Sequence, residues 1–169
     1  MSPSLLRAIT TFGFVGLMRP APGTWGSAVA LVLGIAIDRF LGFPALVVAT
    51  LGVTALGFYA CEAALKDRPG EDPSEIVIDE VAGQWLTLLF PAAAFWNMGL
   101  ENWAVVAYPG WVAAFLFFRL FDIWKPWLVG RADRRGDAKG VMLDDLWAGL
   151  FAGLAVVAAA GFSHGVLMK

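Results

Sequence analysis

The chain has 169 residues and a formal net charge of -2, and 59% of its residues are hydrophobic while only 15% are charged. Together with a mean hydropathy of +0.71, this composition excludes an ordinary soluble domain and indicates a membrane protein. The pI near 5.3 gives no indication of a nucleic-acid partner, and a single cysteine excludes an internal disulfide.

Five apolar segments follow one another along the chain, and roughly 20 apolar residues in a helix suffice to cross a hydrocarbon layer of about 30 Å. The first, Trp25–Ile37, is short and starts at a Pro/Gly turn, so it either crosses at a tilt or re-enters part way; we favour crossing. The others are long enough to cross: Phe40–Cys61, Val81–Leu100, Asn102–Phe118 and Leu146–Met168. The expected fold is all-α, a polytopic transmembrane helical bundle with four to five membrane segments, forming one integral-membrane domain over residues 1–169.

Charges predict the orientation of this bundle, since cytoplasmic flanks collect Lys and Arg. With the N-terminus inside and five crossings, ten of the twelve Lys and Arg residues lie inside, and only Arg39 and Lys169 lie outside. Twelve of the fourteen acidic residues share the inner side, although acids contribute little to orientation. The chemistry is therefore expected at the inner face.

The N-terminal block PGTWGS predicts a turn at Pro22-Gly23, followed by a helix that Thr24 or Ser27 caps. The free N–H groups at the start of a helix can bind an anion. Thr24 and Ser27 are therefore candidate residues for binding a phosphate.

A first acidic pair, Asp79-Glu80, stands directly before a run of twenty uncharged residues. The preceding Asp-Pro-Ser-Glu stretch predicts Asp72 as the N-cap of a helix that starts near Pro73, with Glu75 as a capping residue. The acidic pair is then expected near the second turn of a helix that continues into the membrane.

A second pair, Asp144-Asp145, stands where the last apolar segment begins. A helix N-terminus stabilises nearby acids by about 0.3–1 kcal/mol each, which explains one acid better than two adjacent acids on each of two helices. Four converging carboxylates would repel one another, and a divalent cation removes that penalty. Carboxylate oxygens are preferred ligands of Mg²⁺, so Asp79, Glu80, Asp144 and Asp145 are predicted to bind this cation. The Cys and His ligands of a zinc site are missing, since the only histidine, His164, is at the far end of the last segment.

Basic residues with one further acid accompany these pairs. Arg119, Asp122 and Lys125 lie in FRLFDIWKPW, and Arg134 follows in RADRRGDAKG. Arginine and lysine bind phosphate oxygens, although basic residues at an inner flank also contact anionic lipid headgroups and fix orientation. Acids suited to a metal beside these cations indicate phosphoester chemistry. Close helix contact within the monomer is predicted at the G-x-x-x-G pair Gly149 and Gly153.

Four blocks, in this order along the chain, resemble the phosphatidylglycerophosphatase A family: PGTWGS (22–27), IVIDEVAGQW (76–85), FRLFDIWKPW (118–127), and DR with GVMLDDLWAG (133–134 and 140–149). The resemblance implies an all-helical bundle in which a central helix is surrounded by others. It also implies a Mg²⁺-dependent phosphomonoesterase of the bacterial inner membrane, which converts phosphatidylglycerophosphate in the bilayer to phosphatidylglycerol and phosphate.

By position, the resemblance assigns the two acidic pairs to metal binding and catalysis. Asp122 and Lys125 match the F-D-x-W-K-P block and are the further catalytic residues, while Lys125, Arg119 and Arg134 are expected to hold the phosphate. Asp122 is expected to orient Lys125 or to act as a base. The chain departs from the family in the loop 136–140, where relatives carry paired glycines.

Two mechanisms remain open from the sequence: attack by a metal-activated water, and attack by an Asp carboxylate through an aspartyl-phosphate. Two other functions also remain as alternatives. A CDP-alcohol phosphatidyltransferase needs an acidic spacing that is absent here, and a non-enzymatic transporter or channel needs acids within the spans or at both mouths. Oligomeric state is not readable from the sequence.

Overall fold

The computed structural model describes residues 1–68, 70–71, 73–99 and 108–163. Residues with a predicted role or segment boundary that lie outside this part are Asp72, Leu100, Asn102, His164 and Met168.

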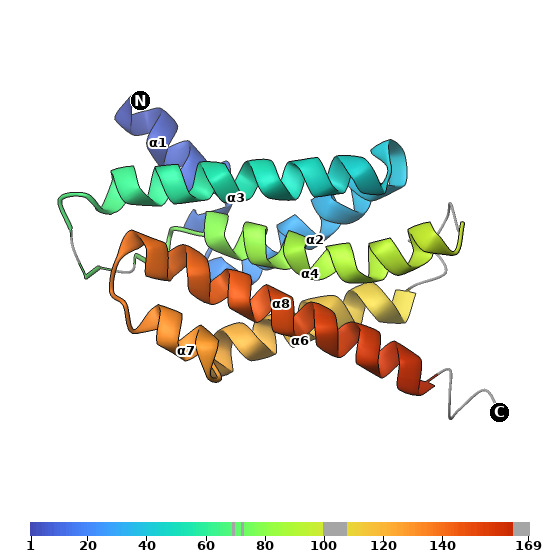
Figure 1. The fold of residues 1–169 in the computed structure, drawn as a ribbon. Helices are drawn as coiled ribbons and strands as arrows, with labels where there is room; N and C mark the ends of the chain where they lie inside the picture. The colour runs from blue at the N-terminus through green and yellow to red at the C-terminus, as the bar shows by residue number, and fades with distance from the viewer. Residues whose placement is uncertain (69, 72, 100–107, 164–169) are drawn as a thin grey trace.

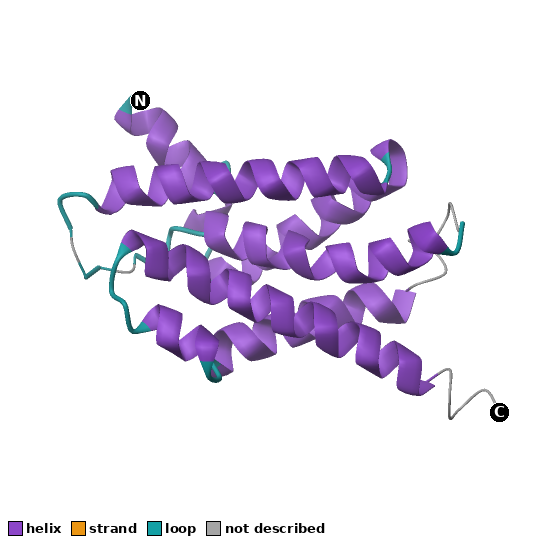
Figure 2. Ribbon diagram, viewed as in Figure 1, coloured by secondary structure: helices purple, strands orange, loops and turns teal. Residues whose placement is uncertain are grey.

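Within the described residues the chain is helical and contains no strand (Figure 2). The helices are α1 (Pro3–Thr10), the 3₁₀ turn η1 (Val15–Leu17), α2 (Pro22–Leu41), α3 (Phe43–Leu65), α4 (Ile78–Asn97), α6 (Tyr108–Trp124), α7 (Leu128–Asp133) and α8 (Ala138–Phe162). The all-α prediction is confirmed.

Helix α4 lies in the middle of the bundle and packs against α2, α3, α6 and α8 (Figure 1). The starts of α4 and α8, the end of α6 and the short α7 all lie at one end of the bundle, on the left in Figure 1. Polar segments that are far apart in the sequence therefore meet there.

Three of the described helices, α2, α3 and α8, are long and apolar enough to cross a membrane. The short segment Trp25–Ile37 lies within α2, so its length is compatible with a full crossing. Helices α4 and α6 are not among the three, and the expected total of four to five segments stays a prediction.

Glycines bring α4 and α8 into backbone contact. A Cβ atom on Gly149 would lie only 2.4 Å from the carbonyl oxygen of Gly83, and one on Gly153 would lie 2.1 Å from the ring of Phe90. The Thr87 hydroxyl strengthens the crossing by donating to the Gly149 carbonyl at 3.1 Å. The predicted role of this glycine pair in packing within the monomer is confirmed.

The predicted start of α4 near Pro73 is wrong, because the helix begins five residues later. The preceding segment is held by the N-terminal part of the chain instead. The backbone N–H of Val77 donates to the carbonyl of Thr10 at 2.9 Å, and the carboxylate of Glu75 lies 3.7 Å from the guanidinium of Arg7. Glu75 therefore forms an ion pair and does not cap α4.

The starts of α2 and α8 also differ from the prediction. Helix α2 already begins at Pro22, so Thr24 and Ser27 lie inside it and do not cap it; the Ser27 hydroxyl donates to the Gly23 carbonyl at 2.7 Å. Helix α8 begins at Ala138, capped by Asp137, and the second acidic pair lies about two turns inside it. The departure from the family pattern at 136–140 thus still produces a well-capped helix start.

Candidate functional site

Three carboxylates converge where α4 starts and α8 passes it. Asp79 and Glu80 lie in the first turn of α4, and Asp145 lies on α8. Each offers one oxygen, and these oxygens all lie within 4.8 Å of one another. Asp79 is only 7% exposed and Asp145 only 3%. Buried carboxylates this close repel one another, so the cluster favours a bound cation.

The donor set of this acid cluster (Asp79, Glu80 and Asp145) fits a hard divalent cation such as Mg²⁺, because every donor is a carboxylate oxygen. In the same cluster, Oε2 of Glu80 is buried and has no hydrogen-bond partner among the described residues. An acceptor of this kind is expected to have a ligand. Of the four predicted metal ligands, the structure thus groups three.

Gly23 shows why the block PGTWGS belongs to this site. A Cβ atom at this position would lie 2.1 Å from Oε1 of Glu80 and 3.3 Å from Nη1 of Arg119. Only glycine lets the first turn of α2 approach the acid so closely. Thr24, the next residue, is half-buried in the same turn.

Asp144 has a different environment from its neighbour Asp145. The ammonium group of Lys125 donates to Oδ2 of Asp144 at 2.8 Å and also to Asp133 on α7. Burial works to lower the pKa of Lys125, but its hydrogen bonds with Asp133 and Asp144 prevail and raise this pKa well above its ordinary value. Lys125 therefore stays charged and pairs with Asp144, although the sequence predicts Asp144 as a metal ligand.

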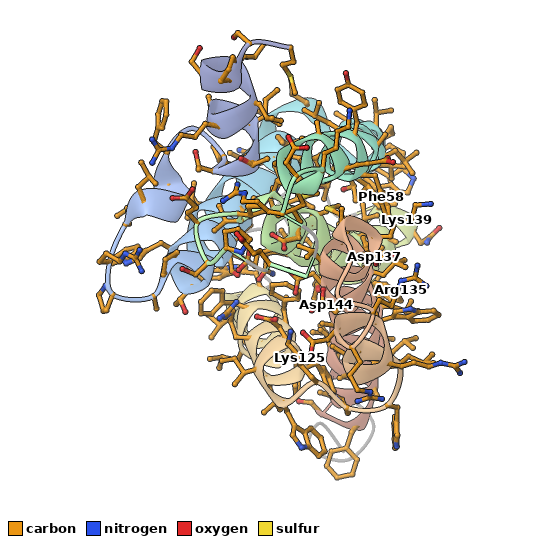
Figure 3. The ribbon with its side chains drawn as sticks, turned by 90° about the vertical axis from the view of Figure 1, so that its left-hand side faces the viewer. Phe58, Lys125, Arg135, Asp137, Lys139 and Asp144 are labelled. Atoms are coloured by element: carbon orange, nitrogen blue, oxygen red, sulfur yellow. The ribbon has the colours of Figure 1, made fainter. Side chains whose placement is uncertain are left out.

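A tight turn after α6 directs Lys125 towards α7 and α8. Lys125 and Trp127, on either side of Pro126, have φ angles of 50° and 42°, a left-handed conformation that is uncommon for residues other than glycine. Gly130 permits the reversal, since a Cβ atom there would lie 2.5 Å from the Lys125 carbonyl oxygen. Figure 3 shows Lys125 beside Asp144 when the bundle is viewed from this end.

Arg119 forms a second cationic group next to the acid cluster. Its Nη1 donates to the Asp122 carboxylate and to the Ser27 hydroxyl, the latter at 3.4 Å. Asp122 thus orients Arg119 and not Lys125, contrary to the first of its two predicted roles. Its other predicted role, as a base, stays a prediction. Arg134 is exposed at the end of α7, where it lies beside Gly130, and is not part of this group.

Two polar residues of the site were not predicted from their sequence motifs. Asp133 accepts from Lys125, and Gln84 is completely buried one turn after Glu80. Asp133 stands in a block that carries the resemblance, eight residues after Lys125, with Gly130 between them. For Gln84 the available signal is its amide group in the uncharged run of residues 81–100.

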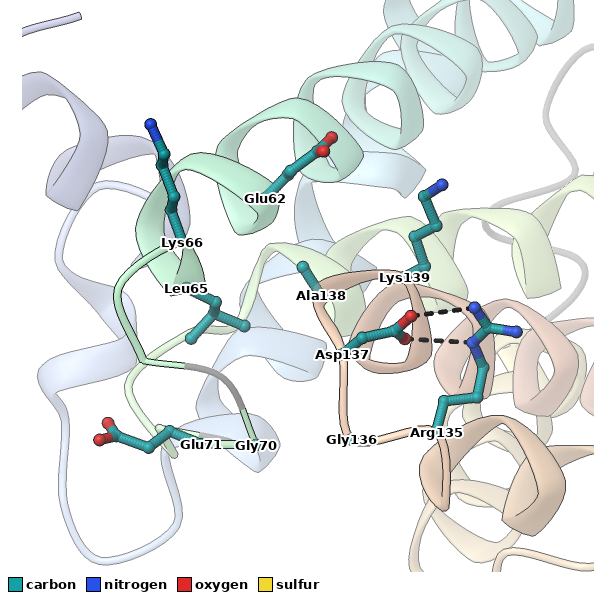
Figure 4. Close-up of a pocket in the computed structure, with 10 residues that line it drawn as sticks. All are labelled: Glu62, Leu65, Lys66, Gly70, Glu71, Arg135, Gly136, Asp137, Ala138 and Lys139. Atoms are coloured by element: carbon teal, nitrogen blue, oxygen red, sulfur yellow. Dashed lines mark hydrogen bonds and ion pairs between the residues drawn. The ribbon is translucent and has the colours of Figure 1, made fainter.

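A separate hollow of about 270 Å³ lies between the end of α3 and the start of α8 (Figure 4). Its charged lining residues are three acids and three bases: Glu62, Glu71, Asp137, Lys66, Arg135 and Lys139. Arg135 forms two hydrogen bonds with Asp137, of 3.1 and 2.9 Å. None of the predicted site residues lines this hollow, and its charges balance.

Comparison with known proteins identifies the family of the chain. The family model for phosphatidylglycerophosphatase A matches residues 8–160. A phosphatidylglycerophosphatase A of Haemophilus influenzae is 33% identical over 145 residues, which cover 85% of this chain and 81% of that protein. The enzyme of the same name from Escherichia coli K12 is 35% identical over 138 residues, covering 80% and 72%. A putative phosphatidylinositol-3-phosphatase of Bacteroides thetaiotaomicron is 36% identical over 163 residues, covering 93% and 95%. No solved structure matches the chain.

Proposed function

Because the chain belongs to the phosphatidylglycerophosphatase A family, we propose that its acid cluster is the metal centre of a Mg²⁺-dependent lipid phosphatase. The enzyme hydrolyses the terminal phosphomonoester of phosphatidylglycerophosphate to give phosphatidylglycerol and phosphate. The single observation that supports the metal centre most strongly is the convergence of three buried carboxylates from α4 and α8 within 4.8 Å.

In this proposal Asp79, Glu80 and Asp145 hold the cation. When bound, Mg²⁺ neutralises phosphate charge and increases the acidity of a water molecule. Asp144 accepts a hydrogen bond from Lys125 and thereby holds this lysine beside the site. A direct contact between Asp144 and the metal stays a prediction, which the Asp144→Asn variant tests.

The chain's own cations hold the phosphate. Arg119 is fixed by Asp122 and Ser27, so its guanidinium is already oriented before substrate binds. Lys125 supplies a compact positive charge that two carboxylates keep in place. Such preorganised donors stabilise the charge that shifts onto the leaving oxygen.

Two further residues with a predicted role in substrate binding lie at the margin of this group. Thr24 is in the first turn of α2 next to Gly23, and Arg134 is exposed on the Lys125 side. We propose that both contact the headgroup as it enters.

We propose that the site faces the cytoplasm at the bacterial inner membrane, with the lipid tails remaining in the bilayer. The distribution of Lys and Arg supports this orientation, and three apolar helices support membrane association. Membership of the family favours the phosphatase over a phosphatidyltransferase or a transporter. The name of the Bacteroides relative makes a phosphoinositide monoester the second substrate to test.

The test is phosphate release by purified protein, with and without Mg²⁺, from phosphatidylglycerophosphate and from phosphatidylinositol-3-phosphate. The parent is expected to release phosphate from the first lipid only with Mg²⁺, and Asp79→Asn and Asp145→Asn are expected to lose nearly all of this activity. Asp137→Asn, an exposed acid on the same face, is the matched control and should retain activity. No release by the parent would contradict the function, and unchanged release by both cluster variants would contradict the site.

Two further measurements separate the two routes of attack. A trapped phosphoenzyme would establish an Asp nucleophile. Inversion of configuration at phosphorus, with no phosphoenzyme trapped, would establish a single displacement by water.

A further inference from the structure

Gln84 is a buried polar residue in the middle of the central helix. Its side chain is 0% exposed, and neither its amide oxygen nor its amide nitrogen has a hydrogen-bond partner among the described residues. Two neighbouring buried polar groups on α4 are satisfied: the Trp85 indole donates to the Ala30 carbonyl at 2.7 Å, and the Thr87 hydroxyl donates to the Gly83 carbonyl at 2.9 Å. Gln84 therefore differs from its neighbours.

The position of Gln84 connects it to the acid cluster. It follows Glu80 by four residues, so the two side chains lie on the same face of α4, about 5–6 Å apart at their Cβ atoms. Glu80 faces Gly23 of α2 and Arg119 of α6. Gln84 thus lies one turn deeper on the face that carries Glu80.

Three side chains in this region have buried polar atoms without a partner among the described residues. Glu80 and Gln84 each have an unpaired acceptor oxygen, and Gln84 and Arg119 each have an unpaired donor nitrogen. A buried water molecule makes two to four hydrogen bonds and both donates and accepts. Donors and acceptors together therefore match ordered water better than an anion or a cation alone.

The cost to protein stability of burying the Gln84 amide is a second reason to assign this residue a role. A buried amide without partners lowers stability relative to an apolar side chain of similar shape. An unbranched apolar residue such as methionine has nearly the same length and could fill this position. A glutamine here is consistent with a residue whose amide serves the site.

We propose that Gln84 is a positioning residue that holds ordered water behind Glu80 and thereby fixes the orientation of the Glu80 carboxylate at the metal centre. The proposal rests on the proposed role of Glu80 as a metal ligand. It assigns Gln84 no contact with the substrate. Its effect reaches the metal only through Glu80, as hydrogen bonds behind a ligand do in other metal sites.

The test is binding of Mn²⁺, a spectroscopic substitute for Mg²⁺, to purified full-length protein, measured by electron paramagnetic resonance. Gln84→Met removes both polar atoms and nearly keeps the volume. It is expected to weaken Mn²⁺ binding by about 10- to 100-fold. Its melting temperature without metal should stay close to that of the parent, because methionine fills nearly the same volume. Leu88→Met, at another fully buried position of α4, is the matched control and should bind Mn²⁺ like the parent.

Gln84→Asn keeps an amide and leaves room for additional water, so its affinity should lie between those of the parent and Gln84→Met. This variant also carries the test if Gln84→Met does not fold. Parent-like Mn²⁺ affinity in the folded Gln84 variants would overturn the proposal while leaving the metal centre intact. A parent that binds no Mn²⁺ would overturn both, and this outcome is distinguishable because the failure is already present before any substitution.

Discussion

Asp144 and Asp145 are adjacent in the sequence and both buried, yet their surroundings differ. Asp144 accepts a hydrogen bond from Lys125 at 2.8 Å, so the chain itself supplies its positive charge. Asp145 lies within 4.8 Å of two further acids, Asp79 and Glu80. Successive residues of a helix point about 100° apart, which lets one helix serve two different partners.

The difference suggests a division of labour within one short segment. On the Lys125 side, one ammonium group pairs with the carboxylates of Asp133 and Asp144 and so connects the end of α6 with α7 and α8. The acid cluster is expected to acquire its positive charge from solution. A structural ion pair thus lies directly beside a site for an exchangeable cation.

The largest effect is expected when Asp145 and Asp144 are each replaced by asparagine in separate variants. Asp145→Asn should lower kcat/KM for phosphate release roughly 10³-fold, because the cation loses a ligand. Asp144→Asn should lower it less, since Lys125 keeps its bond to Asp133. Equal losses of activity and of Mg²⁺ dependence in the two variants would contradict the different roles of Asp144 and Asp145. That result would indicate that Asp144 is also a metal ligand.

A smaller effect is expected from Lys125→Met. Loss of the phosphate-binding charge should lower kcat/KM roughly 10²-fold. The variant also leaves Asp144 buried without its cation, so the free energy of unfolding should fall by about 1–3 kcal/mol.

Adding Asp144→Asn to Lys125→Met should restore stability but not activity. Urea unfolding and the phosphate assay measure the two effects separately. Equal losses of stability in the single and double variants would show that the pair does not hold these elements together.

Close packing of α4 and α8 at glycine residues brings the acid cluster together, and Gly149→Ala tests this role. A Cβ atom would lie 2.4 Å from the Gly83 carbonyl oxygen, so α4 and α8 must separate. Activity should fall roughly 10- to 100-fold because the ligands on the two helices move apart. Gly52→Ala on α3 is the matched control: its Cβ atom meets nothing within 4 Å, and activity should be unchanged.

The smallest effect is expected at Asp137, which caps α8 but lies outside the acid cluster. Asp137→Ala should lower the free energy of unfolding by about 0.5–2 kcal/mol and leave kcat unchanged. Hydrogen bonds from Arg135 lower the pKa of Asp137. Its contribution to stability is therefore complete above the unfolded pKa of about 3.9 and is lost as the pH falls through the lowered value. Unfolding of parent and variant at pH 7 and at pH 3 measures this difference.

The sequence predicted the helical class and the residues of the acid cluster because these depend on local composition and on motif blocks. Hydropathy alone predicted the apolar segments, and two acidic pairs before apolar runs supplied the candidate ligands. The cluster members Asp79, Glu80 and Asp145 do meet in the structure.

The starts of α4 and α2 were not predicted, because contacts with other segments override their local signals. The helix signal at Pro73 was overridden because Val77 bonds to Thr10 and Glu75 pairs with Arg7. The cap signal at the Pro22-Gly23 turn was likewise displaced, since α2 begins at Pro22 itself.

The partners of the charged side chains were also beyond the sequence. Lys125 reaches Asp133 and Asp144 only because the chain reverses through two left-handed residues, one of which is Trp127. In a sequence, glycine indicates such a conformation, but lysine and tryptophan do not. The different roles of the two neighbouring acids on α8 follow from that reversal.

The most direct test of the central claim is the dissociation constant of Mn²⁺ for purified parent protein, Asp145→Asn and Asp144→Asn in the absence of substrate. The acid cluster predicts that the parent binds Mn²⁺, that Asp145→Asn loses this binding, and that Asp144→Asn largely keeps it. Parent-like affinity in Asp145→Asn would contradict the assignment of Asp79, Glu80 and Asp145 as the metal centre.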